Sequence, residues 1–181
     1  MNMTKLQKLC ALLIMFSLIS CDDQAAKPAA TAQDFPQFDS FQAPSEIDQL
    51  KARLFDNPGD FETLSLLGDR YFESARYLEA IQTYDKALVV NPMCADCLND
   101  RGLAQYYIGD PNSALESFDR AIAIDPEYVH VWLSKGYVLF SVGRYEEAIP
   151  VLNKVKELDT TGGLAAEADK FIAKAVEKNY Q

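Results

Sequence analysis

The chain has 181 residues, 49% of them hydrophobic and 24% charged, which is enough to bury the core of one domain with appended segments. Its 17 Lys and Arg residues are outnumbered by 27 Asp and Glu residues, so the formal net charge is −10. A surface this acidic repels polyanions, and the composition therefore argues against nucleic-acid binding.

The first twenty residues form an apolar segment with a basic start. Lys5 and Lys8 precede a mainly apolar run, residues 9–20. A helix that spans a bilayer needs about 20 residues, whereas a signal peptide has a shorter hydrophobic region behind a basic flank. Residues 1–20 are therefore predicted to be a signal peptide, and a buried N-terminal helix is the alternative.

The apolar segment ends in Leu18-Ile19-Ser20-Cys21. An aliphatic residue, two further residues of which the second is small, and a cysteine together resemble the bacterial lipobox. The resemblance implies cleavage before Cys21 and lipidation of its sulfur, and several acyl chains anchor a protein stably. Asp22 resembles the signal that retains lipoproteins in the inner membrane of well-studied Gram-negative bacteria. The expected location is thus the bacterial envelope, at the periplasmic face of the inner membrane where this sorting rule applies.

Residues 21–44 are rich in Ala, Pro, Gln and Asp and keep no helical or strand period, so they are predicted to form a flexible tether. Phe35, Phe38 and Phe41 recur every third residue in it, although such segments are usually poor in aromatic residues. Two interpretations stand. The rings pack on the edge of the folded domain, or they form a short motif that binds a partner or the protein's own groove.

Beyond residue 60 the same pattern of residues recurs at a constant spacing, which is the distance along the sequence between Gly68 and Gly102. Small residues, large apolar residues and unit-ending prolines all recur at this step. The columns are Gly68, Gly102 and Gly136; Ala80, Ala114 and Ala148; Leu64, Leu98 and Trp132; Tyr84, Phe118 and Leu152; and Pro92 with Pro126. This combination, with its period of about 34 residues, resembles the tetratricopeptide repeat (TPR).

The resemblance implies an all-α fold, a TPR helix-turn-helix solenoid in residues 45–179. Three repeats are expected at about 61–94, 95–128 and 129–162. Apolar residues at helical spacing predict an N-terminal half-repeat helix over 45–56 and a C-terminal capping helix over 164–178. The outer face of the capping helix is charged, as the end of an open solenoid requires.

Three residues depart from the repeat pattern. Arg101 and Lys135 stand where the first unit has Leu67, and we expect their stems to pack while their charges reach water. Pro150 falls inside an expected helix, which it should kink unless it lies near the first turns.

In this family the first helices of the units line a concave face that binds peptides. Carried over position by position, the resemblance assigns to this groove Glu62, Ser65, Asp69, Phe72, Asp96, Asn99, Leu103, Tyr106, His130, Leu133, Tyr137 and Phe140. Chaperone-binding members grip a C-terminal carboxylate with Lys, Arg and Asn at such positions. Most of these positions here are acidic, apolar or aromatic, so that carboxylate clamp is absent.

The groove residues also indicate what a partner would offer. Phe72, Tyr106 and Phe140 recur at the repeat step and are expected to form an aromatic ladder along the groove. The expected partner is a protein or peptide segment with apolar or aromatic anchors. A basic residue of it would lie near the acids Glu62, Asp69 and Asp96. The alternative is that the aromatic ladder packs inside the helix pairs.

Cys94 and Cys97 are the two cysteines outside the signal peptide and the lipobox. Their spacing can close a disulfide, and the predicted compartment is oxidising. Cys94 falls near an expected helix start, which lowers the pKa of a thiol. A structural disulfide, a pair of inert thiols and a redox-active pair all remain open.

No motif for catalysis, metal or cofactor stands out. Two thiols alone do not complete a zinc site, phosphate-binding loops are absent, and the single histidine, His130, has no nucleophile motif beside it. The leading hypothesis is a membrane-anchored periplasmic TPR lipoprotein that is a protein–protein interaction scaffold or assembly factor for an envelope complex, and not an enzyme. The alternative is a thiol-disulfide relay module, for example in cytochrome c maturation, that uses Cys94 and Cys97. The partner, the pathway and the oligomeric state are left open by the sequence.

Overall fold

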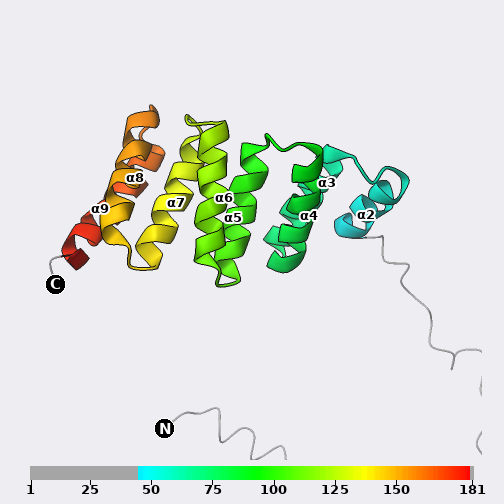
Figure 1. Ribbon diagram of the computed structural model, residues 1–181, viewed down its shortest axis with the longest axis horizontal. Coiled ribbons are helices and arrows are strands. Elements are labelled where there is room, and N and C mark those ends of the chain that lie inside the picture. The colour runs from blue at the N-terminus through cyan, green and yellow to red at the C-terminus, as the bar shows by residue number, and fades with distance from the viewer. Residues whose placement is uncertain (1–44, 180–181) are drawn as a thin grey trace, which may run out of the picture. The chain divides into compact units, whose positions relative to one another are not determined.

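The computed structural model describes residues 45–179, and the regular structure of that range is entirely α-helical (Figure 1). The predicted all-α TPR solenoid is thereby confirmed. The helices are α2 (Glu46–Asp56), α3 (Phe61–Glu73), α4 (Tyr77–Val90), α5 (Ala95–Tyr107), α6 (Pro111–Ile124), α7 (Val129–Ser141), α8 (Tyr145–Leu158) and α9 (Gly163–Asn179). The predicted signal peptide, Cys21, Asp22 and the segment with Phe35, Phe38 and Phe41 lie outside the described residues.

The helices form pairs at a regular step along the chain. α3 with α4, α5 with α6, and α7 with α8 are the three helix pairs, and their first helices begin at Phe61, Ala95 and Val129. α9 begins at Gly163, one further step of the same length along the chain. The capping helix therefore occupies the place of the first helix of a fourth unit, and α2 precedes the first pair.

Side chains and prolines determine where the helices begin and end. α4 and α6 end just before Pro92 and Pro126, because a residue that precedes proline disfavours the helical conformation. Pro111 is the first residue of α6, and the Asp110 side chain accepts a hydrogen bond from the Ser113 amide at 3.1 Å. The third unit, which lacks such a proline, ends at a different kind of junction.

Asp159 makes the junction between α8 and α9. Its carboxylate accepts hydrogen bonds from the backbone amides of Thr161, at 2.9 Å, and Ala165, at 2.8 Å. These bonds, with the one from the Thr161 hydroxyl, hold the pKa of Asp159 well below its usual range. One carboxylate therefore starts the capping helix where the first two units use proline.

Within each pair a glycine lies against a large side chain of the second helix. A Cβ at Gly68, Gly102 or Gly136 would fall within 2.6 Å of an atom of its neighbour. These neighbours are Tyr84, Phe118 and Leu152, all at most 1% exposed. The glycine column thus allows the two helices of a unit to approach closely enough to bury the large column completely.

Ion pairs join neighbouring units. The Arg101 Nε lies 2.6 Å from Asp85 Oδ1 across the α4–α5 boundary. Lys135 pairs in the same way with Asp119 across the α6–α7 boundary. The stems of Arg101 and Lys135 pack as expected, since each side chain is only about one-fifth exposed. Their charged ends lie in exposed contacts with a carboxylate of the preceding unit, a pairing that the sequence did not indicate.

α8 runs through Pro150 as one helix, with the proline in its second turn. Within residues 45–179 no helix combines the length and the apolar character needed to cross a membrane.

Candidate functional site: the concave groove

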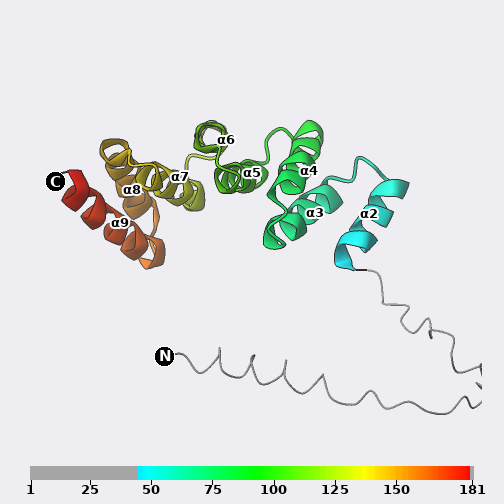
Figure 2. The ribbon, with the colours of Figure 1, turned by 90° about the horizontal axis from the view of Figure 1, so that it is seen from below.

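The first helices of the units line the inner side of the helix array. α3 contacts α5, α5 contacts α7, and α7 contacts α9, whereas among the described helices α4 and α6 do not meet, nor do α6 and α8. An array whose first helices touch and whose second helices diverge bends toward the first helices. Figure 2 shows α5 and α6 in separate layers of this array. The groove residues expected from the sequence therefore lie on helices of the concave side.

A pocket of about 230 Å³ opens between α5, α7 and α9. It brings together three expected groove residues, Leu103, Leu133 and Tyr137, with four that the sequence analysis did not name. These four are Tyr107, Ser134, Glu167 and Phe171. The lining is mostly apolar and aromatic with one carboxylate, which suits an apolar side chain of a partner.

The expected aromatic ladder is part of a longer chain of ring contacts. Phe72 meets Tyr77 and Tyr107, and Tyr106 meets Tyr107 and Tyr137, with ring centroids 5.5–5.8 Å apart. The chain continues through Tyr137–Phe171, Phe171–Phe140 and Phe140–Tyr145 at 5.4–5.6 Å. Rings at such distances stabilise one another beyond their burial alone.

The ring contacts place the three ladder residues in different surroundings. Phe72 and Phe140 contact Tyr77 and Tyr145, the first residues of the second helices of their own pairs. These two rings therefore pack partly within their own helix pairs, as the alternative interpretation had it, but Phe72 also contacts Tyr107 of the next unit and Phe140 also contacts Phe171 of α9. Tyr106 likewise contacts the next unit, through Tyr137. Among the rings of this chain of contacts, only that of Tyr107 belongs to an exposed residue, with half of its surface accessible to solvent (50%).

At the other end of the groove, acids gather between α3 and α5. The Tyr84 hydroxyl donates to Asp69 at 2.8 Å, and the Tyr128 hydroxyl donates to Asp96 at 2.5 Å. Asn99 Nδ2 donates to Asp100 Oδ1 at 3.0 Å. Three of the expected groove residues, Asp69, Asp96 and Asn99, thus share one acidic cluster with Asp100, which the sequence analysis missed.

Burial and mutual repulsion change the proton affinity of this cluster. Burial raises the pKa of Asp69, and the carboxylate of Asp96 raises it further. Burial also raises the pKa of Asp100 to about 7, with Asp96 and Asp69 adding to the effect. Burial is likewise the main cause of the raised pKa of the Tyr84 and Tyr128 hydroxyls. Asp100 therefore keeps its proton up to about pH 7, and the cluster carries its full negative charge only above that pH.

The remaining expected groove residues lie at the margins. Glu62 and His130 are exposed, and the His130 ring lies 5.9 Å from that of Tyr128. Ser65 is half-buried, with its hydroxyl 3.8 Å from the Cys97 sulfur. No His, Cys, Asp and Glu side chains within 45–179 group in a way that could hold a metal ion.

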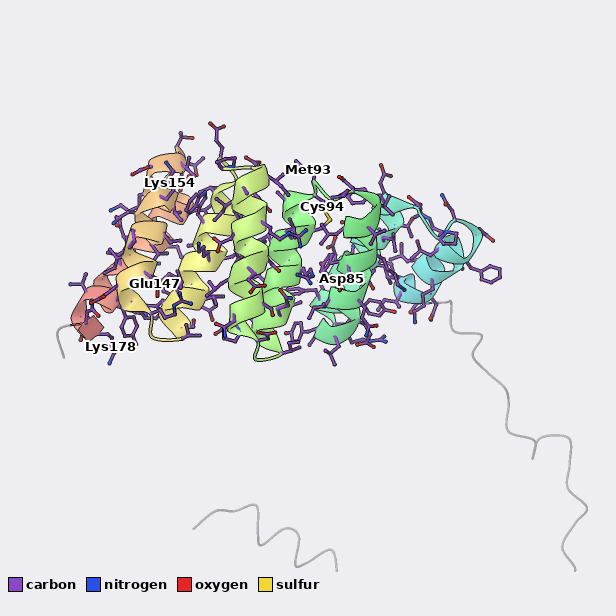
Figure 3. All side chains as sticks on the ribbon, in the orientation of Figure 1. Asp85, Met93, Cys94, Glu147, Lys154 and Lys178 are labelled. Carbon is purple, nitrogen blue, oxygen red and sulfur yellow. A yellow bond between two sulfur atoms is a disulfide. The ribbon has the colours of Figure 1, made fainter. Side chains whose placement is uncertain are left out.

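The structure joins Cys94 and Cys97 as a disulfide, with the sulfurs 2.17 Å apart. Cys94 is the N-cap of α5, next to the loop that carries Met93 (Figure 3), and its sulfur accepts a hydrogen bond from the Cys97 amide. Cys97 is 1% exposed, whereas Cys94 is half-buried. A thiol from solution could therefore reach the sulfur of Cys94 and not that of Cys97.

Some of the missed residues carried a signal in the sequence. Phe171 continues the series Asp69, Leu103 and Tyr137 at the repeat step, and it would have been found by extending the repeat into α9. Asp100 stands in a column with Leu66, Ser134 and Ala168, so an acid there is unusual. Tyr107 and Glu167 had no such signal.

Comparisons with known proteins agree with this architecture. A family model described as "Tetratricopeptide repeat" matches residues 99–162, and one described as "TPR repeat" matches residues 68–109. Small glutamine-rich tetratricopeptide repeat-containing protein 2 of Mycosarcoma maydis is 32% identical over 133 residues, which is 71% of this chain and 35% of that protein. Its Saccharomyces cerevisiae counterpart is 29% identical over 120 residues, 66% of this chain and 34% of that protein. The chain spans about a third of the length of these curated relatives.

Solved structures show the same fold. The crystal structure of MamA has a TM-score of 0.61 and 27% identity, covering 74% of this chain and 86% of that one. The TPR2B domain of yeast Sti1, solved in complex with pHsp70, has a TM-score of 0.63 and 24% identity, covering 65% of this chain and 97% of that one. The chain therefore carries tetratricopeptide repeats over residues 68–162, and proteins built from such repeats are protein–protein interaction scaffolds.

Proposed function

We propose that this protein is a membrane-anchored periplasmic lipoprotein whose repeat domain captures a segment of another protein and thereby acts as a scaffold or assembly factor for an envelope complex. The observation that carries the proposal is the groove, where an apolar pocket between α5, α7 and α9 lies on the same concave side as the acidic cluster. The yeast Sti1 domain, which shares the fold, was solved in complex with pHsp70, and this supports a peptide-like partner here.

The chemistry of the groove favours a different partner segment from an acidic peptide tail. Asp69, Asp96 and Asp100 would repel a carboxylate, and the pocket offers Leu103, Leu133 and aromatic rings. A segment with an apolar or aromatic anchor fits the pocket, because anchors of this kind supply most of the binding energy in interfaces.

The membrane anchor is supported by the sequence alone. The basic start, the apolar run 9–20 and the lipobox-like residues that end at Cys21 occur together in the expected order. An anchor followed by a coil-like tether of about twenty residues would hold the repeat domain at an r.m.s. distance of roughly 25–30 Å from the membrane surface.

Site-specific photo-crosslinking tests the scaffold. Tyr107, on the pocket rim, would be replaced by a photoreactive phenylalanine analogue in the full chain, and Arg120, exposed on α6, would carry the same analogue as the control. Irradiation in the native cells should yield a discrete adduct from position 107 and none from position 120. Equal adducts from both positions, or none from position 107, would contradict a groove-based scaffold.

Metabolic labelling with an alkynyl fatty acid tests the anchor. The wild-type chain should take up the label and sediment with membranes, whereas Cys21→Ala should do neither. Asp22→Ser, which keeps the cysteine, should remain labelled and move from the inner to the outer membrane where the aspartate sorting rule holds. A labelled Cys21→Ala chain would refute the anchor.

The second candidate, a thiol-disulfide relay, is favoured by one observation. Cys94 is half-buried at the start of α5, in the position where a helix stabilises a thiolate. Replacing both Cys94 and Cys97 by Ser separates the two functions, because a scaffold keeps the position-107 adduct and a relay loses its activity. Unchanged activity of the double variant in the native cells would contradict the relay.

A further inference from the structure

Three carboxylates at the acidic end of the groove have no cationic partner within residues 45–179. Asp69, Asp96 and Asp100 make no ion pair there, although nine other ion pairs are present. The donors that reach the three acids are two tyrosine hydroxyls and the Asn99 amide. These neutral groups satisfy single oxygens and leave the charge uncompensated.

The two arginines adjacent to these acids in sequence are directed elsewhere. Arg101, next to Asp100, bonds Asp85 at 2.6 Å and the Ser117 hydroxyl at 2.7 Å. Arg70, next to Asp69, bonds Glu73 at 2.7 Å. Both arginines are thus held by other carboxylates, and neither makes an ion pair with the cluster.

Asn99 supplies an independent observation. Its side chain is 5% exposed, and its Oδ1 has no hydrogen-bond donor in the part of the chain described. A buried carbonyl oxygen without a donor costs about 1–3 kcal/mol, so such atoms are rare unless a ligand completes them. Since Nδ2 of the same amide donates to Asp100, the unpartnered oxygen lies beside the acidic cluster.

We propose that Asp69, Asp96, Asp100 and the Oδ1 of Asn99 form a binding site for one lysine or arginine side chain of the protein partner. The inference rests on the proposed scaffold function for the source of that side chain. An ammonium or guanidinium group has only donors and a positive charge, and so matches three carboxylates that make no ion pair in the described residues and an amide oxygen without a donor.

The proton affinity of the cluster agrees with this assignment. Asp100 on α5 faces Asp69 of α3 and Tyr84 of α4, with Asp96 on its own helix and Tyr128 just before α7. Apart from Arg70, whose charge slightly offsets the pKa rise of Asp69, every one of these groups is neutral or acidic. A bound cation would favour the ionised form of Asp100, whose ionised fraction increases about ten-fold from pH 6 to pH 8. The affinity of the cluster for a lysine or arginine side chain should therefore rise by up to about ten-fold over this range.

Carboxyl-carbon NMR of the full chain in detergent micelles tests the site without a partner protein. The probe is Nα-acetyl-lysine methylamide, and its control is Nα-acetyl-norleucine methylamide, which has a similar stem without the ammonium group. The lysine probe should shift the Cγ signals of Asp96 and Asp100 saturably, and the norleucine probe should not. Asp96→Asn and Asp100→Asn should each weaken lysine binding at least three-fold.

Glu116→Gln is the matched control, because Glu116 is exposed on α6 and the change in net charge is the same. It should leave lysine binding unchanged. The proposal is overturned by unsaturable shifts, by equal shifts from norleucine, by equal weakening in Glu116→Gln, or by Ca²⁺ binding to these carboxylates while lysine does not. If any of these results is obtained while the analogue at position 107 still forms its adduct, the proposed scaffold function is supported and only this binding site is refuted.

Discussion

The ring of Tyr84 on α4 lies directly over Gly68 on α3, so that a Cβ at Gly68 would be 2.5 Å from Cε1 of the ring. The hydroxyl beyond that ring donates to Asp69 at 2.8 Å. One close helix contact therefore supports both the core and the acidic end of the groove.

Gly68→Ala should lower the free energy of unfolding by about 2–3 kcal/mol, because the buried ring must shift in a close-packed core. Gly102→Ala should have a similar effect through Phe118, and Gly136→Ala a smaller one because the Leu152 side chain can change its rotamer. Chemical denaturation measures all three. Gly59→Ala, which meets nothing within 4 Å, is the control, and an equal loss there would contradict the packing explanation.

Ala75 occupies the turn position that glycine occupies in the other two units. Its φ is 56°, against 87° for Gly109 and 79° for Gly143, and all three turns are closed by the same pair of backbone hydrogen bonds. An L-residue in this region is strained by about 1 kcal/mol. Ala75→Gly should raise the free energy of unfolding by about 0.5–1 kcal/mol. Gly109→Ala should lower it, and a stability loss in Ala75→Gly would refute the strain.

The repeat step predicted the helix pairs well because each column is fixed by local packing within one unit. The large ring at position 84 leaves room only for glycine at position 68, and both residues are visible in the sequence. The step could not show what arises between units. Arg101 is bound to Asp85, and Asp100 lies near Asp69 of α3 and Tyr84 of α4, only because the neighbouring pair is placed as it is.

The aromatic residues illustrate the same limit. Phe72, Tyr106 and Phe140 share a column and all three contact a ring beyond their own pair, yet only Phe72 and Phe140 also contact a ring of their own second helix. Their surroundings depend on Tyr77, Tyr145 and Tyr137, and column 77–111–145 holds a proline in the middle unit. A column predicts a position on a helix, and the residues in neighbouring columns decide what that position contacts.

The stability of the domain should depend on pH through Asp100. The folded chain holds this proton up to about pH 7, whereas the unfolded chain releases it near 3.8. The unfolded state therefore binds fewer protons between these values, and the free energy of unfolding falls as pH rises through that window. Allowing for partial solvent screening, the fall attributable to Asp100 is about 1–2 kcal/mol between pH 5 and pH 8.

Asp100→Asn removes the titrating group and should flatten this part of the profile, with a gain in stability at pH 8. Urea denaturation at several pH values measures both effects. Glu116→Gln should keep the wild-type slope. An unchanged slope in Asp100→Asn would show that the carboxyl is ionised in the folded protein at pH 5.

Reduction of the Cys94–Cys97 disulfide should destabilise the start of α5. Closing so short a loop is worth about 2 kcal/mol by the chain-entropy relation, and for a domain of this size the melting temperature should fall by about 4–8 °C. Thermal unfolding with and without reductant measures the shift, and alkylation with mass spectrometry shows the thiol count. The variant with Cys94→Ala and Cys97→Ala should melt at a temperature close to that of the reduced wild type, and the reductant should not change its melting temperature.

Cys97 precedes Asn99 and Asp100 by two and three residues on α5. Amide hydrogen exchange in this first part of α5 should therefore rise first when the disulfide is reduced. Equal melting of the oxidised and reduced chains would mean that packing against α3 holds this turn without the bond.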